Sequence, residues 1–272
     1  MVCKGAIRND VRTRELLLRH MAMTRNGKRS VGGAHFEAES TIGTLRLHEH
    51  LGDSWGILFS HPRDYTPVCT TELGRAAAAS PEFTKRNVKM IALSIDSVED
   101  HHGWSKDILA YNNDETVSTF PFPIIADSKR ELAVELGMLD PDAKDQAGMP
   151  LTARCVFVIG PDKKLKLSLL YPATTGRNFD EILRVIDSLQ LTAYRRVATP
   201  VDWKPGDRVM VPPSIPEEEA RSLFPAGVYT KELPSGKKYL RYTPQPRTNH
   251  KHNSEDQRPG RDQTTETIEL AL

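Results

Sequence analysis

Short apolar runs alternate with helix-like segments through the middle of the chain. The apolar runs have the length and residue types of buried strands, and they lie at 55–60 (WGILFS), 88–96 (VKMIALSID) and 122–127 (FPIIAD). The segments that follow them have helical character, and they lie at 70–87, 98–113 and 129–138. We expect the first helix to be interrupted near Ser80 and Pro81. This order predicts consecutive βαβ units with helices packed on a sheet.

A hairpin and a final helix follow these units. Residues 153–160 (ARCVFVIG) and 164–172 (KLKLSLLYP) are strand-like, and they flank PDKK, whose composition is typical of a turn. Residues 178–192 then carry apolar side chains at helical spacing. The whole pattern predicts an α/β fold in which helices cover both faces of a mixed central sheet.

The character of the chain changes at both ends. Residues 1–30 hold eight basic and two acidic side chains, which fits either an organelle transit peptide or a short amphipathic helix, and the segment is not rich in serine, which disfavours targeting. After a main domain at 31–192, the frequent prolines of residues 193–246 predict a small C-terminal domain. Residues 247–272 are polar and predict a flexible tail.

The overall composition is that of an ordinary globular protein. Apolar residues make up 38% and charged residues 27% of the 272 residues, and the net charge is +1. This balance gives no reason to expect a nucleic-acid partner, and no apolar run approaches the roughly 20 residues that span a bilayer. The three cysteines, Cys3, Cys69 and Cys155, are too few and too far apart for a disulfide framework. We therefore expect a reducing compartment and a cytoplasmic protein.

Cys69 stands just after the strand at 55–60, where the next helix is predicted to start. Unpaired backbone N–H groups at a helix start carry partial positive charge and stabilise a thiolate, which is the nucleophilic form of cysteine. A lone cysteine is nevertheless more often a small buried hydrophobe. Position alone therefore leaves both interpretations open.

The residues around Cys69 favour chemistry. Pro62, Thr66 and Cys69 form the pattern P-x-x-x-T-x-x-C, and in this pattern the chain resembles the peroxiredoxins. The resemblance implies a thioredoxin-like fold and a peroxidase whose nucleophile is Cys69. Thr66 would hydrogen-bond the thiolate and the incoming peroxide, while Pro62 would shield the sulfur. Arg154 matches the arginine with which the family stabilises the thiolate and the developing negative charge.

Longer segments are similar to the 1-Cys type, the peroxiredoxin 6 subgroup, over about residues 36–246. Among them are ALSIDSVEDH, LYPATTGRNFDEILRVIDSLQLT, VATPVDWKPGD and LPSGKKYLRYTPQP. The resemblance ends at SVGGAHF (30–36), which replaces the usual opening of the family, and after Pro246.

This resemblance implies substrates, partners and a location. The substrates are hydrogen peroxide, organic hydroperoxides and phospholipid hydroperoxides. No cofactor is bound, and glutathione, delivered by a glutathione S-transferase, is the external reductant. The subgroup also implies a homodimer, peripheral contact with membranes, and a location in the cytoplasm and in lysosomes.

A peroxidatic thiolate becomes a sulfenic acid, which a second thiol must reduce. Cys155 is the last cysteine, and it adjoins Arg154 on a predicted strand, where successive side chains point to opposite faces. If Arg154 faces the site, Cys155 faces away from it and packs in the core. Cys3, in the N-terminal extension, stays an alternative partner. We expect an external thiol to do this work.

A second pattern, GDSWG at 52–56, matches G-x-S-x-G. A nucleophile elbow needs a strand before the serine, whereas here a strand follows it, so the residues alone favour a turn. The resemblance adds a calcium-independent phospholipase A2 site at Ser54, His48 and Asp162. It also adds a lysophospholipid acyltransferase motif, H-x-x-x-x-D, at His48 and Asp53.

The remaining histidines carry weaker signals. His61 either tunes the thiolate, contacts lipid head groups, or only caps the end of a strand. His101 and His102 lack the spacing of metal ligands, so we expect no metal. Two other classes of function compete with a peroxidase: a lipid hydrolase with Ser54 as its nucleophile, and a non-catalytic thioredoxin-fold chaperone or scaffold. The presence of Thr66 and Arg154 argues against the non-catalytic class.

Overall fold

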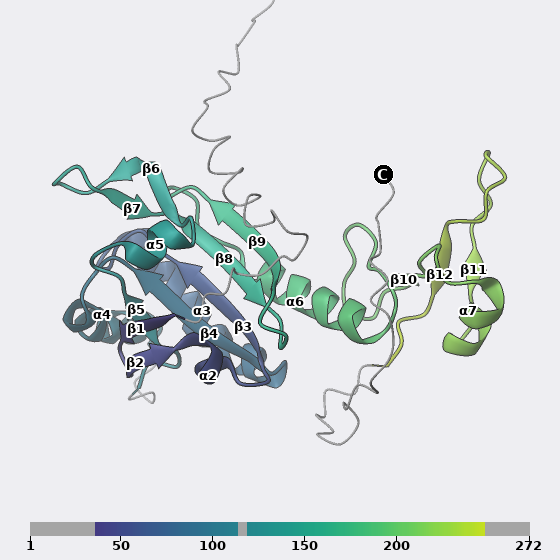
Figure 1. Ribbon diagram of the computed structural model, residues 1–272, viewed down its shortest axis with the longest axis horizontal. Coiled ribbons are helices and arrows are strands. Elements are labelled where there is room, and N and C mark those ends of the chain that lie inside the picture. The colour runs from purple at the N-terminus through teal and green to yellow at the C-terminus, as the bar shows by residue number, and fades with distance from the viewer. Residues whose placement is uncertain (1–35, 114–118, 248–272) are drawn as a thin grey trace, which may run out of the picture.

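A seven-stranded sheet forms the centre of the protein. The computed structural model describes residues 36–113 and 119–247 (Figure 1). The strands are β1 (Glu37–Ser40), β2 (Gly43–Arg46), β3 (Trp55–Ser60), β4 (Val88–Ser94), β5 (Ile124–Ala126), β8 (Arg154–Ile159) and β9 (Leu165–Tyr171). Their order across the sheet is β2-β1-β5-β4-β3-β8-β9. The neighbours β3, β4 and β5 run parallel, while the other pairs are antiparallel, which confirms the mixed sheet.

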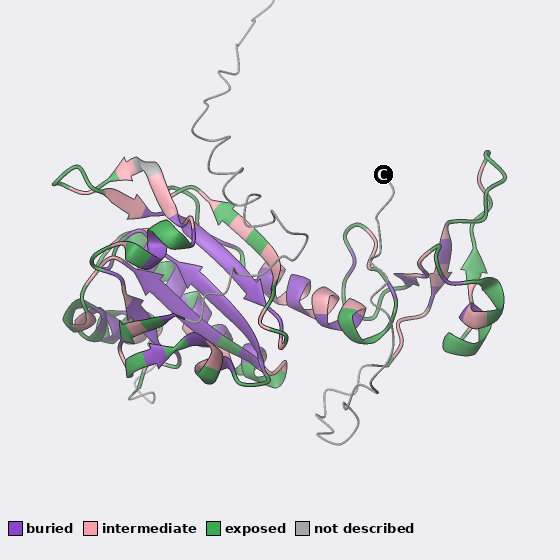
Figure 2. Cartoon of the chain, viewed as in Figure 1, coloured by how far each residue is buried: buried purple, intermediate pink, exposed green. Residues whose placement is uncertain are grey.

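Helices cover both faces of this sheet. The helices α3 (Pro67–Lys85), α4 (Val98–Tyr111) and α6 (Phe179–Tyr194) pack on one face, and the short helices α2 (Leu47–Leu51) and α5 (Glu131–Glu135) pack on the other. Strands β3 and β8 are buried along their whole length, as Figure 2 shows. Along β8, Val156 and Val158 face α3, whereas Cys155 and Phe157 face the other layer. This alternation decides which residues can reach the site.

Helix α3 corrects one prediction. It begins at Pro67, earlier than expected, and it continues through Pro81 without the expected interruption. Proline is favoured in the first turn, where its missing N–H would have no partner. At Pro81 only one helical hydrogen bond is lost, and the proline itself lies on the exposed side. Burial of Ala79 and Phe83 against the core holds the helix together on either side of it.

Several short elements were not predicted. They are the β1–β2 hairpin, helix α2 and a separate two-stranded sheet of β6 (Leu139–Lys144) and β7 (Pro150–Thr152). The four-residue strands β1 and β2 present only two side chains to each face, which is too few for a periodic signal in the sequence. Contacts with the main sheet therefore decide their structure.

The C-terminal part has its own small sheet and core. Strands β10 (Val209–Met210), β11 (Tyr229–Thr230) and β12 (Arg241–Thr243) pair in the order β10-β12-β11, next to helix α7 (Glu217–Leu223). They lie at the far end of α6 from the main sheet (Figure 1). A separate apolar cluster that includes Trp203 and Phe224 holds this part together. The predicted extension at 1–30 and nearly all of the predicted tail lie outside the described residues. No described helix combines the length and apolar character needed to cross a membrane.

Candidate active site

Cys69 lies in the first turn of α3, with its side chain fully buried. Thr66 is the N-cap residue, with extended backbone angles, and Pro67 is the first helical residue. The backbone N–H groups of this turn precede the sulfur along the helix and carry the partial positive charge of the helix start. The local environment therefore favours a negative charge on Cys69.

Arg154 supplies a full positive charge at the same sulfur. It is the first residue of β8, on the same face as Val156 and Val158, and its Nη1 lies 3.3 Å from Cys69 Sγ. The same nitrogen donates to Glu72 Oε2 at 2.5 Å. Its Nε and Nη2 both donate to the carbonyl of Ala173, at 2.9 and 2.6 Å. The guanidinium is therefore held rigidly against the sulfur, and it stays charged at any relevant pH.

A second buried arginine completes this cluster. Arg177 donates from its backbone N–H and from Nε to Glu72 Oε1, at 2.7 and 2.9 Å, and from Nη2 to Glu72 Oε2 at 2.9 Å. Its Nη1 donates to the carbonyls of Ser60 and Cys155, at 2.8 Å each. Burial by itself would raise the pKa of Glu72, but the charges and hydrogen bonds of Arg177 and Arg154 lower it. Glu72 is therefore the shared counter-ion of both arginines.

Sequence reasoning missed Glu72 and Arg177. Glu72 lies one turn of α3 after Cys69, and Arg177 stands in the loop before α6, 105 residues further along. Neither residue belongs to a motif with readable spacing, because the fold alone brings the two segments together. The only available signal was a glutamate on the side of α3 that also carries Cys69, a position where an acidic residue needs a partner.

Pro62 and Thr66 lie in the loop between β3 and α3. Pro62 is buried, as its expected shielding role requires. The Thr66 hydroxyl donates to the carbonyl of Arg63 at 2.9 Å. Since a hydroxyl has a single proton, Thr66 does not donate to Cys69 in this arrangement, and the expected hydrogen bond is replaced by one within the loop. Among the residues that the structure describes, Arg154 provides the polar side-chain contact with the sulfur.

His61 belongs to a buried chain of polar side chains. Its Nε2 lies 2.7 Å from Asp64 Oδ1, and His101 Nδ1 lies 2.5 Å from Asp64 Oδ2. The Ser94 hydroxyl donates to Asp96 Oδ2 at 2.8 Å, and its oxygen also lies 3.4 Å from Asp64 Oδ1. His61 is completely buried, so it offers no surface to a lipid head group in this conformation.

Stability is expected to fall in acid because of Asp64. Burial would raise the pKa of Asp64, but hydrogen bonds from His101 and His61 outweigh burial and lower it from 3.8 to about 2. This contribution is fully present above about pH 4 and is lost as the pH falls through about 2. Urea unfolding between about pH 6 and pH 2.5 should show a steeper loss for the wild type than for Asp64→Asn. Asp180→Asn, at an exposed carboxylate, should follow the wild type; a shared slope for all three proteins would contradict the assignment.

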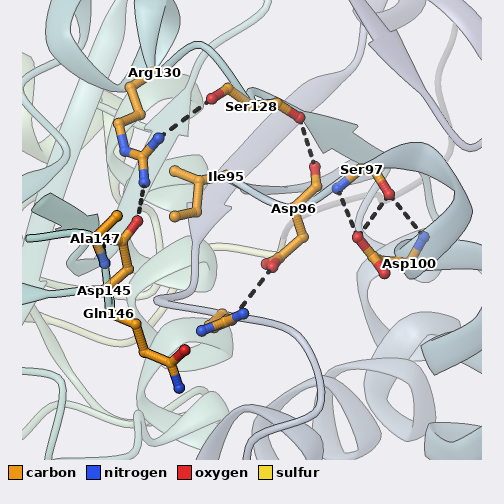
Figure 3. Close-up of a pocket in the computed structure, with 10 residues that line it drawn as sticks. Ile95, Asp96, Ser97, Asp100, Ser128, Arg130, Asp145, Gln146 and Ala147 are labelled. Carbon is orange, nitrogen blue, oxygen red and sulfur yellow. Dashed lines mark hydrogen bonds and ion pairs between the residues drawn. The ribbon is translucent and has the colours of Figure 1, made fainter. Parts of the chain in front are cut away.

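A polar cavity of about 430 Å³ borders this chain (Figure 3). Arg63, from the loop before α3, and Asp96, which accepts the backbone N–H of Asp64 at 2.8 Å, both line it. Asp96 also belongs, with His61 and Asp64, to a group whose ligand-type atoms lie within 4.8 Å of one another. These atoms are engaged mainly with one another and with Ser94. We interpret the group as a hydrogen-bond network and assign no cation to it.

Cys155 packs on the opposite face of the sheet from Cys69. It lies in the apolar cluster of α2 and α5, whereas Cys69 lies in the cluster of α3 and α4. Burial raises the pKa of the Cys155 thiol to about 11. A protonated thiol behind the sheet is poorly placed to attack an oxidised Cys69. Cys3 lies outside the described residues.

In the GDSWG segment, Ser54 lies between α2 and β3. The serine therefore precedes a strand, as predicted, whereas a nucleophile elbow needs a strand before the serine. The Ser54 hydroxyl donates to Asn87 Oδ1 at 2.8 Å. Asp162, in the turn between β8 and β9, is paired with Lys166 at 2.7 Å. His48 lies in α2, and Asp53 is exposed. The neighbouring Lys163 donates to the carbonyl of Gly52, so the turn that carries Asp162 lies beside the serine segment.

Comparison with known proteins agrees with this arrangement. Residues 33–168 match the AhpC/TSA family, and residues 188–227 match the C-terminal domain of 1-Cys peroxiredoxin. Peroxiredoxin-6 of Gallus gallus is 77% identical over 212 residues, which cover 78% of this chain and 95% of that protein. A crystal structure of a mutant peroxiredoxin 6 of Arenicola marina has 64% identity and a TM-score of 0.76, covering 79% of this chain and 96% of that one.

A more distant solved structure extends the comparison. The mitochondrial 1-Cys peroxiredoxin of yeast, described with a thiol resolving mechanism via glutathione and thioredoxin systems, has 46% identity and a TM-score of 0.69. The match covers 77% of this chain and 95% of the yeast chain. Both the thioredoxin-like body and the C-terminal part are therefore shared with these relatives. The chain belongs to the peroxiredoxins, within the AhpC/TSA family, and is a thiol peroxidase.

Proposed function

We propose that this peroxidase reduces hydrogen peroxide, organic hydroperoxides and phospholipid hydroperoxides through Cys69. The observation that carries the proposal is the 3.3 Å contact between Arg154 Nη1 and Cys69 Sγ at the start of α3. The thiolate attacks the terminal peroxide oxygen, so that an S–O bond forms and the O–O bond breaks. Cys69 becomes a sulfenic acid, and the leaving alkoxide takes up a proton and departs as an alcohol, or as water from hydrogen peroxide.

Arg154 contributes twice to this step. Its charge stabilises the thiolate before attack, and it lies where negative charge passes from sulfur to the peroxide oxygens. Because Glu72 and Ala173 hold the guanidinium in place, little reorganisation is needed during the reaction. A vestigial cysteine in a non-catalytic chaperone or scaffold would have no use for such an arrangement.

We further propose that an external thiol, glutathione, completes the cycle. One glutathione attacks the sulfenic acid, which releases water and forms a mixed disulfide; a second one releases the Cys69 thiol and leaves as oxidised glutathione. The position of Cys155 behind the sheet and the resolving systems of the yeast relative support this proposal. Cys69 is fully buried, so the first turn of α3 must open for this reaction, a step that fits delivery by a glutathione S-transferase.

The sulfenic acid should be trapped when no thiol is supplied. One equivalent of peroxide followed by dimedone is expected to add one label at Cys69, detected by mass spectrometry of peptides. Excess peroxide should give sulfinic and sulfonic acids at the same residue. Cys155→Ser should behave like the wild type. A Cys69–Cys155 disulfide within one chain would contradict the placement of Cys155, and a Cys3–Cys69 disulfide would identify Cys3 as the resolving cysteine.

A calcium-independent phospholipase A2 activity at Ser54, His48 and Asp162 is our second proposal, with acyl transfer at His48 and Asp53. The contact between Lys163 and Gly52 supports it, because it brings the turn of Asp162 next to the serine segment. The hydrogen bond from Ser54 to Asn87 would have to break before the serine could attack an ester. A lipid hydrolase as the main activity is therefore less well supported than the peroxidase.

Ser54→Ala tests this second activity. The variant is expected to lose phospholipase activity while it keeps hydrogen peroxide turnover, because Ser54 touches neither Cys69 nor Arg154. Asn87→Ala is the matched control, since it removes the same hydrogen bond and leaves the hydroxyl in place. Circular dichroism should show that both variants are folded, because loss of a local hydrogen bond costs about 1 kcal/mol. If the folded Ser54→Ala protein kept its full lipase activity, Ser54 would not be the nucleophile, and GDSWG would be only a turn.

We also propose a homodimer that contacts membranes peripherally and resides in the cytoplasm and in lysosomes. Strand β9 forms one edge of the seven-stranded sheet, and its Leu170 is 48% exposed. An unpaired edge strand with exposed apolar side chains is a common surface for pairing with a second chain. This supports the dimer.

A further inference from the structure

The polar cavity of about 430 Å³ has the loop between β3 and α3 as one of its walls. Arg63, in this loop, lines the cavity directly. The backbone N–H of Asp64 donates to Asp96 at 2.8 Å. The Tyr65 hydroxyl donates to the carbonyl of Asp100 at 3.3 Å. Because both acceptor residues also line the cavity, a molecule bound there would contact the segment that leads to the peroxidatic cysteine.

The two arginines of the cavity differ in how far they are engaged. Arg130 is held by Asp145 at 2.7 Å and by the carbonyl of Pro150 at 2.9 Å. Arg63 has only a 3.8 Å contact from Nε to Asp96, and its side chain is 52% exposed. Its guanidinium has no other partner among residues 36–113 and 119–247. The Nη1 and Nη2 atoms of Arg63 are therefore available to bind a carboxylate with two parallel hydrogen bonds.

The carboxylates of Asp96 and Asp100 keep unused acceptor capacity. Asp96 accepts from Asp64 and Ser94 through Oδ2, and Asp100 accepts from Ser97 through Oδ2. Within the described part of the chain, neither Oδ1 atom accepts a hydrogen bond. Figure 3 shows the two carboxylates along one side of the cavity. Such oxygens suit the N–H donors of an ammonium group.

A ligand that uses all these groups carries a carboxylate and an ammonium group close together, as an α-amino acid does. A purely anionic ligand would be repelled by the carboxylates of Asp96, Asp100 and Asp145 in the cavity wall. A purely cationic ligand would leave Arg63 without a partner. The volume lies within the range of about 300–1,000 Å³ that is typical of small-molecule sites. Glutathione carries this head group at its γ-glutamyl end.

We propose that the cavity binds the amino-acid head group of the external thiol, with Arg63 on its carboxylate and Asp96 and Asp100 on its ammonium group. The proposal rests on the reduction of Cys69 by glutathione proposed above. The bound thiol attacks the sulfenic sulfur of Cys69, so that an S–S bond forms and the S–O bond breaks. The hydroxyl group leaves as water with the proton of the thiol.

The cavity lies within reach of Cys69. The Thr66 hydroxyl donates to the carbonyl of Arg63 at 2.9 Å, so the chain turns here, and α-carbons across such a turn lie within about 7 Å. Cys69 follows Thr66 by three residues, which is about 4.5 Å along the helix axis. An extended tripeptide spans about 10 Å. A thiol whose head group is held by Arg63 can therefore meet Cys69 once the first turn of α3 opens.

Calorimetric titration of the reduced full-length protein with S-methylglutathione, which cannot react with Cys69, tests the site. We expect binding at one site, which Arg63→Gln should weaken about tenfold through loss of a charge-assisted pair. Arg75→Gln is the matched control, because Arg75 is an exposed arginine of α3 that is paired with Asp180. It should bind like the wild type. No binding to the wild-type protein, or equal binding to Arg63→Gln, would overturn the proposal.

Changes to the ligand test the same contacts without any risk to the fold. N-acetyl-S-methylglutathione lacks the ammonium group, so it should bind about tenfold more weakly than S-methylglutathione. Undiminished binding of the acetylated compound would contradict the role of Asp96 and Asp100. Free glutamate has the head group without the thiol-bearing part, and it should also bind more weakly. If glutamate bound equally well, the cavity would be a site for free amino acids, and the link to the thiol would be wrong.

The choice of thiol tests the role of Arg63 in the cycle. After one equivalent of peroxide, the rates at which glutathione and dithiothreitol reduce the Cys69 sulfenic acid are measured by stopped flow. Dithiothreitol has no charged head group, so the ratio of the two rates should fall about tenfold in Arg63→Gln, and it should stay unchanged in Arg75→Gln. An unchanged ratio in Arg63→Gln would refute the selection of the thiol by Arg63. If no sulfenic acid forms at Cys69, the peroxidase step itself fails, and the titration with S-methylglutathione still decides whether the cavity binds the head group.

Discussion

Replacing Cys69 by serine is expected to reduce peroxide consumption to the uncatalysed background, with hydrogen peroxide or an organic hydroperoxide as substrate and glutathione as reductant. A serine hydroxyl at this position is not ionised by one arginine and a helix start, so it cannot attack the O–O bond. The measurement is the loss of peroxide over time at equal protein concentration. Because serine is nearly isosteric with cysteine, the fold should be preserved.

Cys155→Ser is the matched control for this experiment. Both cysteines are completely buried, on opposite faces of the sheet, but it is the Cys69 sulfur that contacts the Arg154 guanidinium. The control should keep most of the peroxidase activity, and any decrease should follow its loss of stability. Full activity in Cys69→Ser, or equal loss in both variants, would show that Cys69 is not the nucleophile. Replacing glutathione by a neutral dithiol would then separate a failure of the reductant from a failure of the site.

Glu72→Ala is expected to cost about 3–5 kcal/mol of unfolding free energy, because it leaves two buried arginines without their counter-ion. Arg154 and Arg177 are 3% and 0% exposed at their side chains, and both bind Glu72 directly. The measurement is urea unfolding at neutral pH. Peroxidase activity should fall together with stability, because the Arg154 guanidinium loses Glu72, one of the two groups that hold it against the Cys69 sulfur.

Glu82→Ala provides the comparison on the same helix. Glu82 pairs with Lys85 and Arg86 at 2.5 and 3.0 Å, but its side chain is 44% exposed. Water and salt screen such a pair, so a far smaller loss is expected, with no change in activity. Equal losses in the two variants would mean that burial of the Glu72 cluster has no special energetic role. Glu72 also contributes at neutral pH more than in acid, since its pKa is lowered in the folded protein.

The peroxidatic motif was visible because its members stand close together in the chain. Pro62, Thr66 and Cys69 lie within one loop and one helical turn, and the strand and helix on either side have strong apolar patterns. Arg154 could be added because the resemblance supplied it, and the alternation of β8 then placed Cys155 behind the sheet. The role of Thr66 was the exception, because the direction of a hydroxyl depends on its neighbours, and here the nearest acceptor is the carbonyl of Arg63.

The amino-acid sequence by itself determined the class of fold and the approximate positions of the long strands and helices, and it identified Cys69 as the candidate nucleophile. These follow from local periodicity and from residues adjacent in the chain. Only the tertiary structure decided that Glu72 neutralises Arg154 and Arg177, and that His61, Asp64 and His101 form one chain. The physical reason is that buried charges find their partners through space: Glu72 and Arg177 are 105 residues apart, and Asp64 and His101 are 37 apart. The order of the strands and the packing of the helices bring these side chains together in space, and the spacing of residues along the sequence does not indicate such contacts.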